Sequence, residues 1–271
     1  MPIFYDTHAH MDYPEFAQDL AQVIERAAAA GIGKIISIGT DLESSARAVK
    51  LAEQFTGVYA AVGWHPCQAA DAPGDLRPAL RDIARHPKVV AIGETGLDYH
   101  RLPSHGPGGS TADDKRYEKM QADIFRQHME VAAESGLNCV VHQRAAIEDV
   151  LSQMQPFAGK VRGVFHCFVD DPATSRRILA TGSLVSFTGI VTFKNAQSVR
   201  ETVAATPLGQ FMLETDCPYL APMPHRGKRC EPAYVKEIAE RVAEVKGCSL
   251  DELSQATCAT ARRFFPKLDQ T

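Results

Sequence analysis

Short apolar, β-branched runs alternate with amphipathic segments along this chain. Runs bounded by glycine, proline or polar residues predict buried strands, and apolar positions spaced three or four residues apart predict helices. The predicted strands are residues 3–5, 34–38, 58–62, 89–92, 138–141, 161–165, 184–187 and 211–213. The predicted helices are residues 19–30, 44–54, 76–85, 118–135, 145–154, 173–180, 198–205, 233–246 and 250–265.

Local signals mark several of the helix ends. Asp171 precedes a proline that suits the first helical position, and its carboxylate can cap that helix. Residues 249–252 read S-L-D-E, which is a capping box. Gly31 and Gly136 each follow a helical pattern, where a left-handed residue commonly ends a helix.

The order of the elements predicts a closed parallel barrel. Eight strand-then-helix units of roughly 30 residues each are what a TIM-type (β/α)8 barrel requires. An open doubly wound sheet also alternates strand and helix, but no G-x-G-x-x-G motif follows the first strand. We therefore expect an α/β fold with a single TIM-type barrel domain over residues 1–271. One connection is longer than the regular alternation requires. It is the proline- and glycine-rich segment 101–114, which we expect to be a long loop.

Composition and charge narrow the classes of function. Hydrophobic residues make up 45% of the chain and charged residues 23%, as in ordinary globular proteins. A net charge of −4 argues against a broad basic face for duplex DNA, although bound divalent cations would supply positive charge where a phosphate sits. Seven cysteines without a C-x-x-C pair predict a reducing compartment. No signal peptide and no membrane-spanning apolar run are visible, so we expect a cytoplasmic protein.

Polar side chains follow the predicted strands at their carboxyl ends, where barrel enzymes have their active sites. The carboxyl ends of the strands meet at one mouth of such a barrel. His8 and His10 alternate along an extended segment, so both imidazoles can reach one cation. The residues that follow the strands are Asp6, His8, His10, Gly39, Thr40, Trp64, His65, Glu94, His142, His166, Gly189 and Asp216.

Each of these residues alone has an ordinary structural interpretation. A single histidine beside an apolar strand, such as His142, is more often a core residue, and a carboxylate at a strand end can cap the next helix. Structural histidines have no reason to fall at several strand ends together with two acids. We therefore predict a metal site made of nitrogen and oxygen ligands, a mixture that suits Zn, Mn or Mg with open coordination positions. Its ligands are His8, His10, Glu94, His142, His166 and Asp216.

Five sequence motifs resemble those of the TatD family, metal-dependent DNases within the amidohydrolase superfamily. They are D-T-H-A-H at residues 6–10, A-I-G-E-T-G-L-D-Y at 91–99, H-C-F at 166–168, E-T-D-C-P-Y-L-A-P at 214–222 and R-G-K-R at 226–229. The resemblance covers nearly the whole chain, and the second and fourth motifs together are highly specific.

The resemblance implies a TIM barrel that hydrolyses phosphodiester bonds with two divalent metal ions, in some members three. By position, His8, His10 and Asp216 would hold one metal. Glu94 would bridge to the second, which His142 and His166 would complete. Mg or Mn would be the activating ion, and Zn is also compatible with this donor set. The implied substrate is DNA, single-stranded or at 3′ ends, degraded as by an exonuclease, with no obligate protein partner.

The expected mechanism is in-line attack on phosphorus by a metal-activated water. Asp216 would accept the proton of that water while also contacting a metal, and Glu94 is the second expected catalytic residue. His65 is a candidate to orient the phosphate, and Trp64 a candidate to stack on a base of single-stranded DNA. Both residues have a packing role as the alternative. Arg144 is the preferred phosphate contact, ahead of Lys194 and residues 226–229, although Glu214 and Glu231 are plausible ion-pair partners for these cations.

Three departures from the family pattern affect the expected substrate contacts. Where the family usually has H-x-R-D-A, residues 142–146 read H-Q-R-A-A, so an acidic neighbour of Arg144 is missing. Cys230 and Thr260 each stand where asparagine is usual. Segment 101–114 is longer than usual and follows Glu94 closely. The alternatives are a hydrolase of a small ester, amide or phosphoester, and a metal-stabilised binding scaffold, which would not need open coordination positions.

Overall fold

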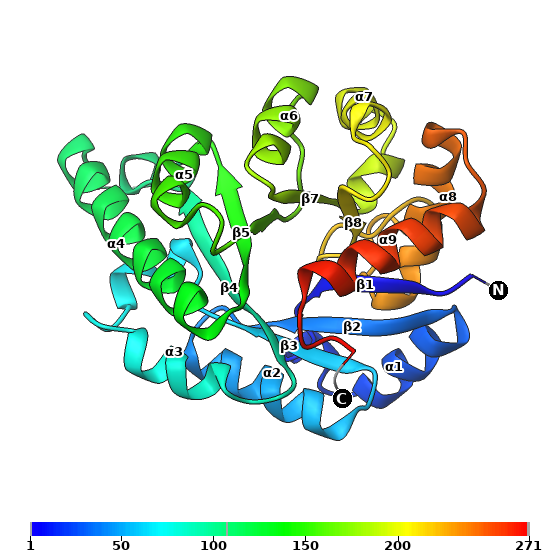
Figure 1. Ribbon diagram of the computed structural model, residues 1–271, viewed down its shortest axis with the longest axis horizontal. Coiled ribbons are helices and arrows are strands. Elements are labelled where there is room, and N and C mark those ends of the chain that lie inside the picture. The colour runs from blue at the N-terminus through cyan, green and yellow to red at the C-terminus, as the bar shows by residue number, and fades with distance from the viewer. Residues whose placement is uncertain (1, 107, 270–271) are drawn as a thin grey trace.

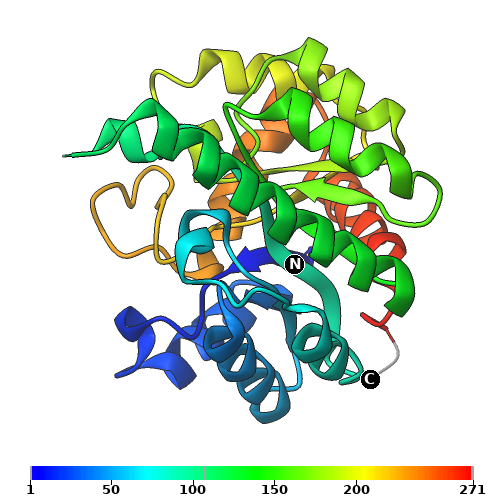
Figure 2. The ribbon, with the colours of Figure 1, turned by 90° about the vertical axis from the view of Figure 1, so that its left-hand side faces the viewer.

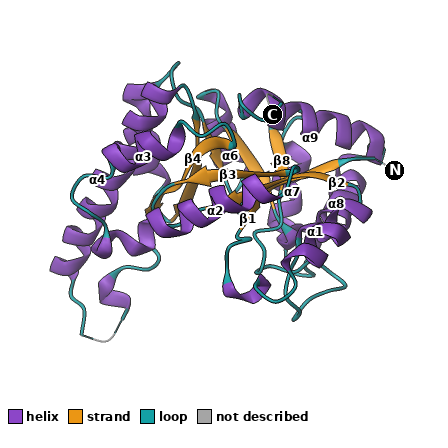
Figure 3. Ribbon diagram, turned by 90° about the horizontal axis from the view of Figure 1, so that it is seen from below, coloured by secondary structure: helices purple, strands orange, loops and turns teal. Residues whose placement is uncertain are grey.

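The computed structural model describes residues 2–106 and 108–269. Eight strands pair side by side in chain order, and every pair is parallel. The strands are β1 (Phe4–Ala9), β2 (Ile32–Ile38), β3 (Val58–Val62), β4 (Val89–Asp98), β5 (Asn138–Arg144), β6 (Gly163–Phe165), β7 (Leu184–Phe187) and β8 (Phe211–Leu213). Helices enclose the strands (Figure 3). This arrangement confirms the predicted (β/α)8 barrel.

Helices follow the strands in the expected alternation. They are α1 (Leu20–Ala29), α2 (Leu42–Gln54), α3 (Arg77–Ala84), α4 (Thr111–Ser135), α5 (Ile147–Met154), α6 (Pro172–Ala180), α7 (Gln197–Ala205), α8 (Val235–Lys246) and α9 (Leu250–Phe264). Short 3-10 helices lie in the connections: η1 (Pro14–Phe16), η2 (Pro66–Asp71), η3 (Pro103–His105), η4 (Gln155–Phe157), η5 (Gly189–Thr192) and η6 (Pro232–Tyr234). No helix of the described residues combines the length and the apolar character needed to cross a membrane.

The predicted helix-capping signals are confirmed. The Asp171 side chain accepts a hydrogen bond from the Thr174 backbone N–H, and Pro172 is the first residue of α6. Ser249 and Glu252 form the capping box of α9. Gly31 and Gly136 have φ angles of 85° and 68°, which place both in the left-handed region that ends a helix.

The barrel closes between β1 and the segment that follows β8. The His10 N–H donates to the Cys217 carbonyl at 2.8 Å, and the Asp216 N–H donates to the His8 carbonyl at 2.9 Å. Asp6 is fully buried, and its carboxylate accepts bonds from the Thr215 N–H at 2.9 Å and hydroxyl at 2.5 Å. Asp6 therefore joins the first strand to the last connection, which holds the segment carrying Asp216 against β1.

The barrel interior is apolar at the end where the strands begin. Side chains such as Ile36, Val90 and Met212 fill it. It is covered by Ala261 and Phe264 of α9 and by Phe265 and Leu268 of the segment that follows. Figure 1 shows α9 lying across β1. A second apolar layer fills the space between the strands and the outer helices. The closed end leaves the carboxyl ends of the strands as the accessible mouth of the barrel.

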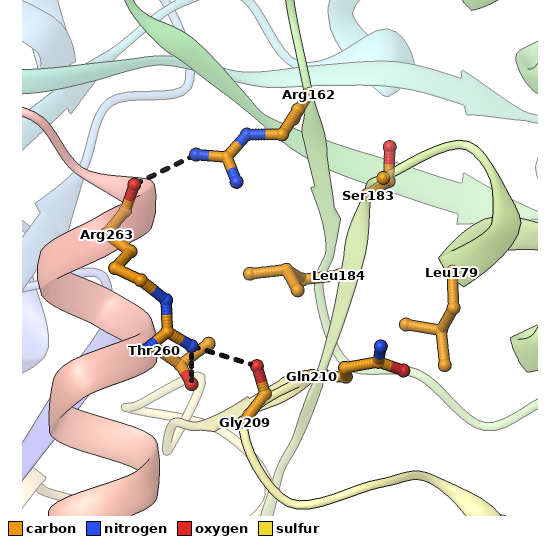
Figure 4. Close-up of a pocket in the computed structure, with 9 residues that line it drawn as sticks. Arg162, Leu179, Ser183, Leu184, Gly209, Gln210, Thr260 and Arg263 are labelled. Atoms are coloured by element: carbon orange, nitrogen blue, oxygen red, sulfur yellow. Dashed lines mark hydrogen bonds between the residues drawn. The ribbon is translucent and has the colours of Figure 1, made fainter.

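A small cavity lies at the closed end, away from this mouth. It has a volume of about 180 Å³ and lies where β6, β7 and β8 begin, beside α9 (Figure 4). The Arg263 guanidinium donates to the Gly209 carbonyl and the Thr260 hydroxyl, while Arg162 donates to the Arg263 carbonyl. Thr260, one of the residues that depart from the family pattern, therefore helps to position the arginine that attaches α9 to the barrel.

Three strands extend further at their carboxyl ends than predicted, and all three extensions contain polar residues. β1 continues to Ala9, β4 to Asp98 and β5 to Arg144. The β4–β5 ladder pairs Gly96 with His142 and Asp98 with Arg144. Gly96 is required there, because its φ is 137° and a Cβ atom would lie 2.0 Å from the His142 carbonyl oxygen. Several predicted strand-end residues, His8, Glu94 and His142 among them, therefore lie within strands.

The prediction that residues 101–114 form one loop is wrong at its carboxyl end. Helix α4 begins at Thr111, because Ser110 and Asp113 form a reciprocal capping box. The shortened loop contains η3 and is held by a bond from the Ser104 N–H to the Asp114 carboxylate at 2.8 Å. It protrudes on the same side of the molecule as the loops after β1, β3 and β8 (left in Figure 2).

Candidate metal centre

The six predicted ligands converge at the barrel mouth. His8, Glu94 and His142 project from strands β1, β4 and β5. His10, His166 and Asp216 lie in the segments that directly follow β1, β6 and β8. All six have partners within the group at 3.5 Å or less, and none is exposed. The structure also brings His65 and Asp98 to this cluster.

Glu94 lies at the centre of the cluster, and its two oxygens face different groups. Oε1 is 2.8 Å from His166 Nε2 and 2.9 Å from His142 Nδ1. Oε2 is 3.5 Å from His8 Nε2 and 3.9 Å from His10 Nε2. The side chain is 2% exposed. A buried carboxylate in this position can contact two cations, one through each oxygen.

The first group of donors surrounds Glu94 Oε2. His8 Nε2 and His10 Nε2 are 3.3 Å apart, and Asp216 Oδ1 lies 3.5 Å from the first and 3.4 Å from the second. Asp216 has a φ of 59°, a strained backbone conformation for a residue other than glycine. The turn after β8 therefore positions its carboxylate between the two imidazoles.

The second group of donors surrounds Glu94 Oε1. His142 Nδ1 and His166 Nε2 are 3.2 Å apart. The other nitrogen of His142, Nε2, is 3.0 Å from Asp98 Oδ2 and donates its proton there. This contact fixes the tautomer in which Nδ1 carries the free lone pair, as in the carboxylate–histidine–metal arrangement of many metalloenzymes.

Sequence reasoning did not single out Asp98 as a functional residue. Asp98 is fully buried, and its other carboxylate oxygen accepts bonds from the N–H groups of His100 at 2.9 Å and Arg101 at 3.0 Å. The available signal was the period of two along β4, because Glu94, Gly96 and Asp98 alternate with the residues between them. That signal was missed because the predicted strand stopped at residue 92.

The donor set fits divalent metal ions. Two ligands on one ion, each about 2.0–2.2 Å from it, are separated by roughly 3.0–3.4 Å at ordinary coordination angles. The separations of 3.3 Å between His8 and His10 and 3.2 Å between His142 and His166 match this spacing. The His8–His10–Asp216 set lies within reach of a single ion.

The two carboxylates of the cluster keep their negative charge. Burial opposes ionisation of Glu94, but the imidazoles that surround it, above all those of His166 and His65, hold its pKa well below its usual value. Burial also opposes ionisation of Asp216, whose pKa is nevertheless lowered by the neighbouring imidazoles, first of all that of His10. Both carboxylates are therefore available as anionic ligands.

His65 is placed to donate a hydrogen bond at the cluster. Its Nδ1 accepts a bond from the Cys67 N–H at 3.0 Å, so the neutral ring carries its proton at Nε2. Nε2 lies 3.2 Å from Glu94 Oε1. On this assignment His65 differs from His142, whose inward nitrogen is unprotonated, although both face the same oxygen.

Trp64 and Arg144, the other two predicted substrate contacts, are not part of this cluster. The Trp64 side chain is buried and its indole N–H donates to the Gln68 carbonyl at 2.8 Å, a placement that favours the packing alternative. Arg144 is the exposed last residue of β5. In the described part of the chain its guanidinium makes no ion pair, so it is free to contact a ligand.

The remaining predicted cations have varied surroundings. Arg229 pairs with Asp19 at 2.7 Å and approaches Glu231 at 3.9 Å, as the ion-pair alternative expects. Arg226 lies over the Phe193 ring at 4.0 Å. Among the described residues, Glu214 forms an ion pair with neither of these arginines. It is buried, accepts a bond from the Cys167 N–H at 2.6 Å and lies 3.8 Å from His166 Nδ1.

The fold and the cluster together define a class of protein. A (β/α)8 barrel with four imidazoles and two charged carboxylates converging at the carboxyl ends of its strands is the framework of a metal-dependent hydrolase. The chain belongs to the TatD family, since the family model for TatD related DNases matches residues 5–266.

Individual relatives agree with this assignment. The chain is 38% identical over 264 residues to the uncharacterized metal-dependent hydrolase YabD of Bacillus subtilis, covering 97% of this chain and 99% of that protein. It is 32% identical over 268 residues to the 3′-5′ ssDNA/RNA exonuclease TatD of Erwinia tasmaniensis, covering 96% and 99%. The crystal structure of YJJV, a TatD homologue of Escherichia coli, superposes with a TM-score of 0.87 at 29% identity, covering 97% and 98%.

Proposed function

We propose that this protein is a two-metal phosphodiesterase that removes nucleotides from single-stranded DNA. One observation carries the proposal: the two oxygens of buried Glu94 face two separate groups of donors. Two ions held in this way, when bound, would neutralise phosphate oxygens and lower the pKa of a water molecule. Family membership and the activity named for the Erwinia relative support a nucleic acid as the substrate.

Each residue of the cluster has its own role in this proposal. His8, His10 and Asp216 would hold one ion, His142 and His166 would hold the other, and Glu94 would contact both. Asp216 also accepts the proton of the attacking water, because its charged carboxylate lies beside His8 and His10 at the proposed metal centre. His65 donates a hydrogen bond from Nε2 to a phosphate oxygen when the substrate displaces Glu94 from that contact.

The test is hydrolysis of end-labelled single-stranded and duplex DNA by metal-stripped protein after addition of Mg, Mn or Zn. Metal-dependent release of single nucleotides from one end of the single strand supports the proposal, and the product ladder gives the polarity. Glu94→Gln should lower kcat by about a thousandfold or more, because loss of one bridging charge removes on the order of 4 kcal/mol of transition-state stabilisation. Glu240→Gln, at a half-exposed position on α8, is the matched control and should be fully active.

Two outcomes would contradict the proposal. Metal-dependent hydrolysis of small esters with no cleavage of any oligonucleotide would assign the site to a small-molecule hydrolase. Binding of a single metal ion per chain, with full activity retained in Glu94→Gln, would overturn the two-metal arrangement.

A further inference from the structure

Exposed apolar side chains gather at the barrel mouth. Among the described residues five large hydrophobic side chains are exposed, and three of them, Val169, Tyr219 and Met223, lie in the loops after β6 and β8. Tyr219 is the aromatic member of this set, with 51% of its surface accessible. Its loop and the loop after β1 protrude on the same side of the molecule, in orange and blue in Figure 2.

The turn after β8 holds Tyr219 beside the metal centre. The Tyr219 N–H donates to the Asp216 carbonyl at 3.1 Å, and the Cys230 N–H donates to the Pro218 carbonyl at 2.9 Å. On the other side the chain packs closely against Gly189, where a Cβ atom would lie 2.3 Å from the Leu220 carbonyl oxygen. Tyr219 is therefore an exposed ring on a fixed backbone, three residues from a proposed ligand.

A second tyrosine links this ring to the cluster. The Tyr13 ring stacks on the His10 ring, with centroids 4.7 Å apart and an interplanar angle of 21°. Tyr219 meets Tyr13 edge to face, with centroids 6.3 Å apart and an angle of 79°. The three rings form a continuous aromatic path from a proposed metal ligand to the solvent.

Charges on both sides of the mouth act on the Tyr219 hydroxyl. Burial raises its pKa, and the negative charges of Glu15 and Asp216 add to this effect, whereas the positive charge of Arg101 opposes it. Arg101 lies in the loop after β4, and its backbone N–H is bound to Asp98. An exposed aromatic face is the surface on which a base of single-stranded nucleic acid stacks.

We propose that Tyr219 is the stacking surface for one unpaired base of a nucleotide flanking the scissile phosphodiester. This inference rests on the proposed nuclease function and names the residue that selects single strands. A base in a duplex is already stacked and paired, so its face is unavailable to Tyr219. Buried Trp64 cannot take this role, because its ring is covered by protein.

The experiment compares wild type with Tyr219→Ala and Tyr219→Phe on three single-stranded oligonucleotides. One has all its bases, and the others carry an abasic nucleotide on one or the other side of the scissile phosphate. Tyr219→Ala should lower kcat/KM on the complete substrate about tenfold, mainly through KM, because base stacking on an aromatic residue contributes about this factor. Tyr219→Phe keeps the ring and should stay within about twofold. Leu208→Ala, at an exposed position before β8, is the control and should behave as wild type.

The abasic substrates separate stacking from a structural effect. On the oligonucleotide that lacks the stacked base, wild type and Tyr219→Ala should be equal. The same loss on all three substrates, or no loss on any, overturns the role of Tyr219 while leaving the nuclease function intact. Failure of the wild type to hydrolyse any oligonucleotide would instead overturn the nuclease function, and this inference with it.

Discussion

The two ends of the barrel interior contrast in chemistry although the same strands line both. Where the strands begin, α9 and the segment after it place Ala261, Phe264, Phe265 and Leu268 over an apolar core. Where the strands end, buried positions are occupied by ionisable side chains, among them His8, Glu94 and Asp98. β4 shows the change along a single strand, since Val90 belongs to the apolar core and Glu94 lies four residues further on.

This contrast separates stability from chemistry within one barrel. Burying ionisable groups without water costs free energy, and partners only partly offset that cost. The covered apolar end instead stabilises the fold, through burial of apolar surface and close packing. Changes at the two ends should therefore have different signatures, with loss of stability at one end and loss of metal binding or turnover at the other.

The largest effect on stability should come from Phe264→Ala. Phe264 is fully buried under the barrel and packs edge to face against Phe265, with centroids 4.9 Å apart. Truncation of a buried phenylalanine lowers the free energy of unfolding by about 3–5 kcal/mol, from lost burial and the cavity left behind. Urea unfolding of the metal-free protein measures this loss, and kcat/KM per folded molecule should stay unchanged. Phe264→Leu should lose less than half as much, and a fall in kcat/KM of the folded variant would show that the ends are coupled.

The apolar end of the barrel was also the easier end to predict from the sequence. Residues 58–62, 184–187 and 211–213 are predicted with the observed bounds, because these runs, apolar except for Ser186, coincide with completely buried strands. The extension of β4 through Glu94 to Asp98 was not predicted, since polar residues interrupt the apolar pattern while the ladder to β5 continues. Strand prediction therefore fails where the apolar residues of the barrel core give way to the polar residues of the candidate site.

The candidate site was predicted through its residue types, and its geometry was not. Four histidines and two acids at strand ends indicate ligands for a metal, but their spacing does not say that Asp98 orients His142 or that His65 is protonated at Nε2. These features depend on contacts between β4, β5 and the segment after β3. The start of α4 at Thr111 was missed because its first turns are polar and exposed, with no apolar stripe to show the helix.

A second prediction concerns His128, a buried residue of α4 near the mouth. Its Nε2 accepts the Trp64 N–H at 2.9 Å and its Nδ1 donates to the Ile124 carbonyl at 2.8 Å, so the folded state needs a neutral ring. Burial lowers the pKa of His128 to about 4 from its usual 6.5. Between these values the unfolded chain binds more protons than the folded one, so the contribution of His128 to stability is lost as pH falls from about 6.5 to about 4.

The difference between wild type and His128→Gln isolates this contribution. Asp6, whose pKa is raised to about 7 by burial, acts in the opposite direction but is common to both proteins. The stability advantage of wild type should shrink by about 3 kcal/mol between pH 7.5 and pH 4. Urea unfolding in the presence of a chelator measures it at each pH. An advantage that stays constant with pH would mean that His128 has the same pKa in the folded and the unfolded state.

The smallest of these three effects is expected for Asp98→Asn, which changes a single contact at the barrel mouth. The asparagine amide can donate to His142 Nε2, which would move the His142 proton to Nδ1 and block the nitrogen that faces Glu94. Loss of such an orienting carboxylate lowers metal affinity by about 10–100-fold. Calorimetric titration of metal-stripped protein with Mn measures this change. Asp170→Asn is the matched control, because Asp170 accepts a bond from Gln143 at 2.6 Å beside the cluster without facing a ligand.

The same titration tests whether the mouth contains two distinct sites. Asp98 contacts His142, and the His8–His10–Asp216 group lies on the other side of Glu94. Asp98→Asn should therefore weaken one of two binding steps and leave the other near its wild-type affinity. Equal weakening of both steps would mean that Glu94 couples the two groups into one cooperative site, whereas unchanged affinity for both would show that His142 binds no metal.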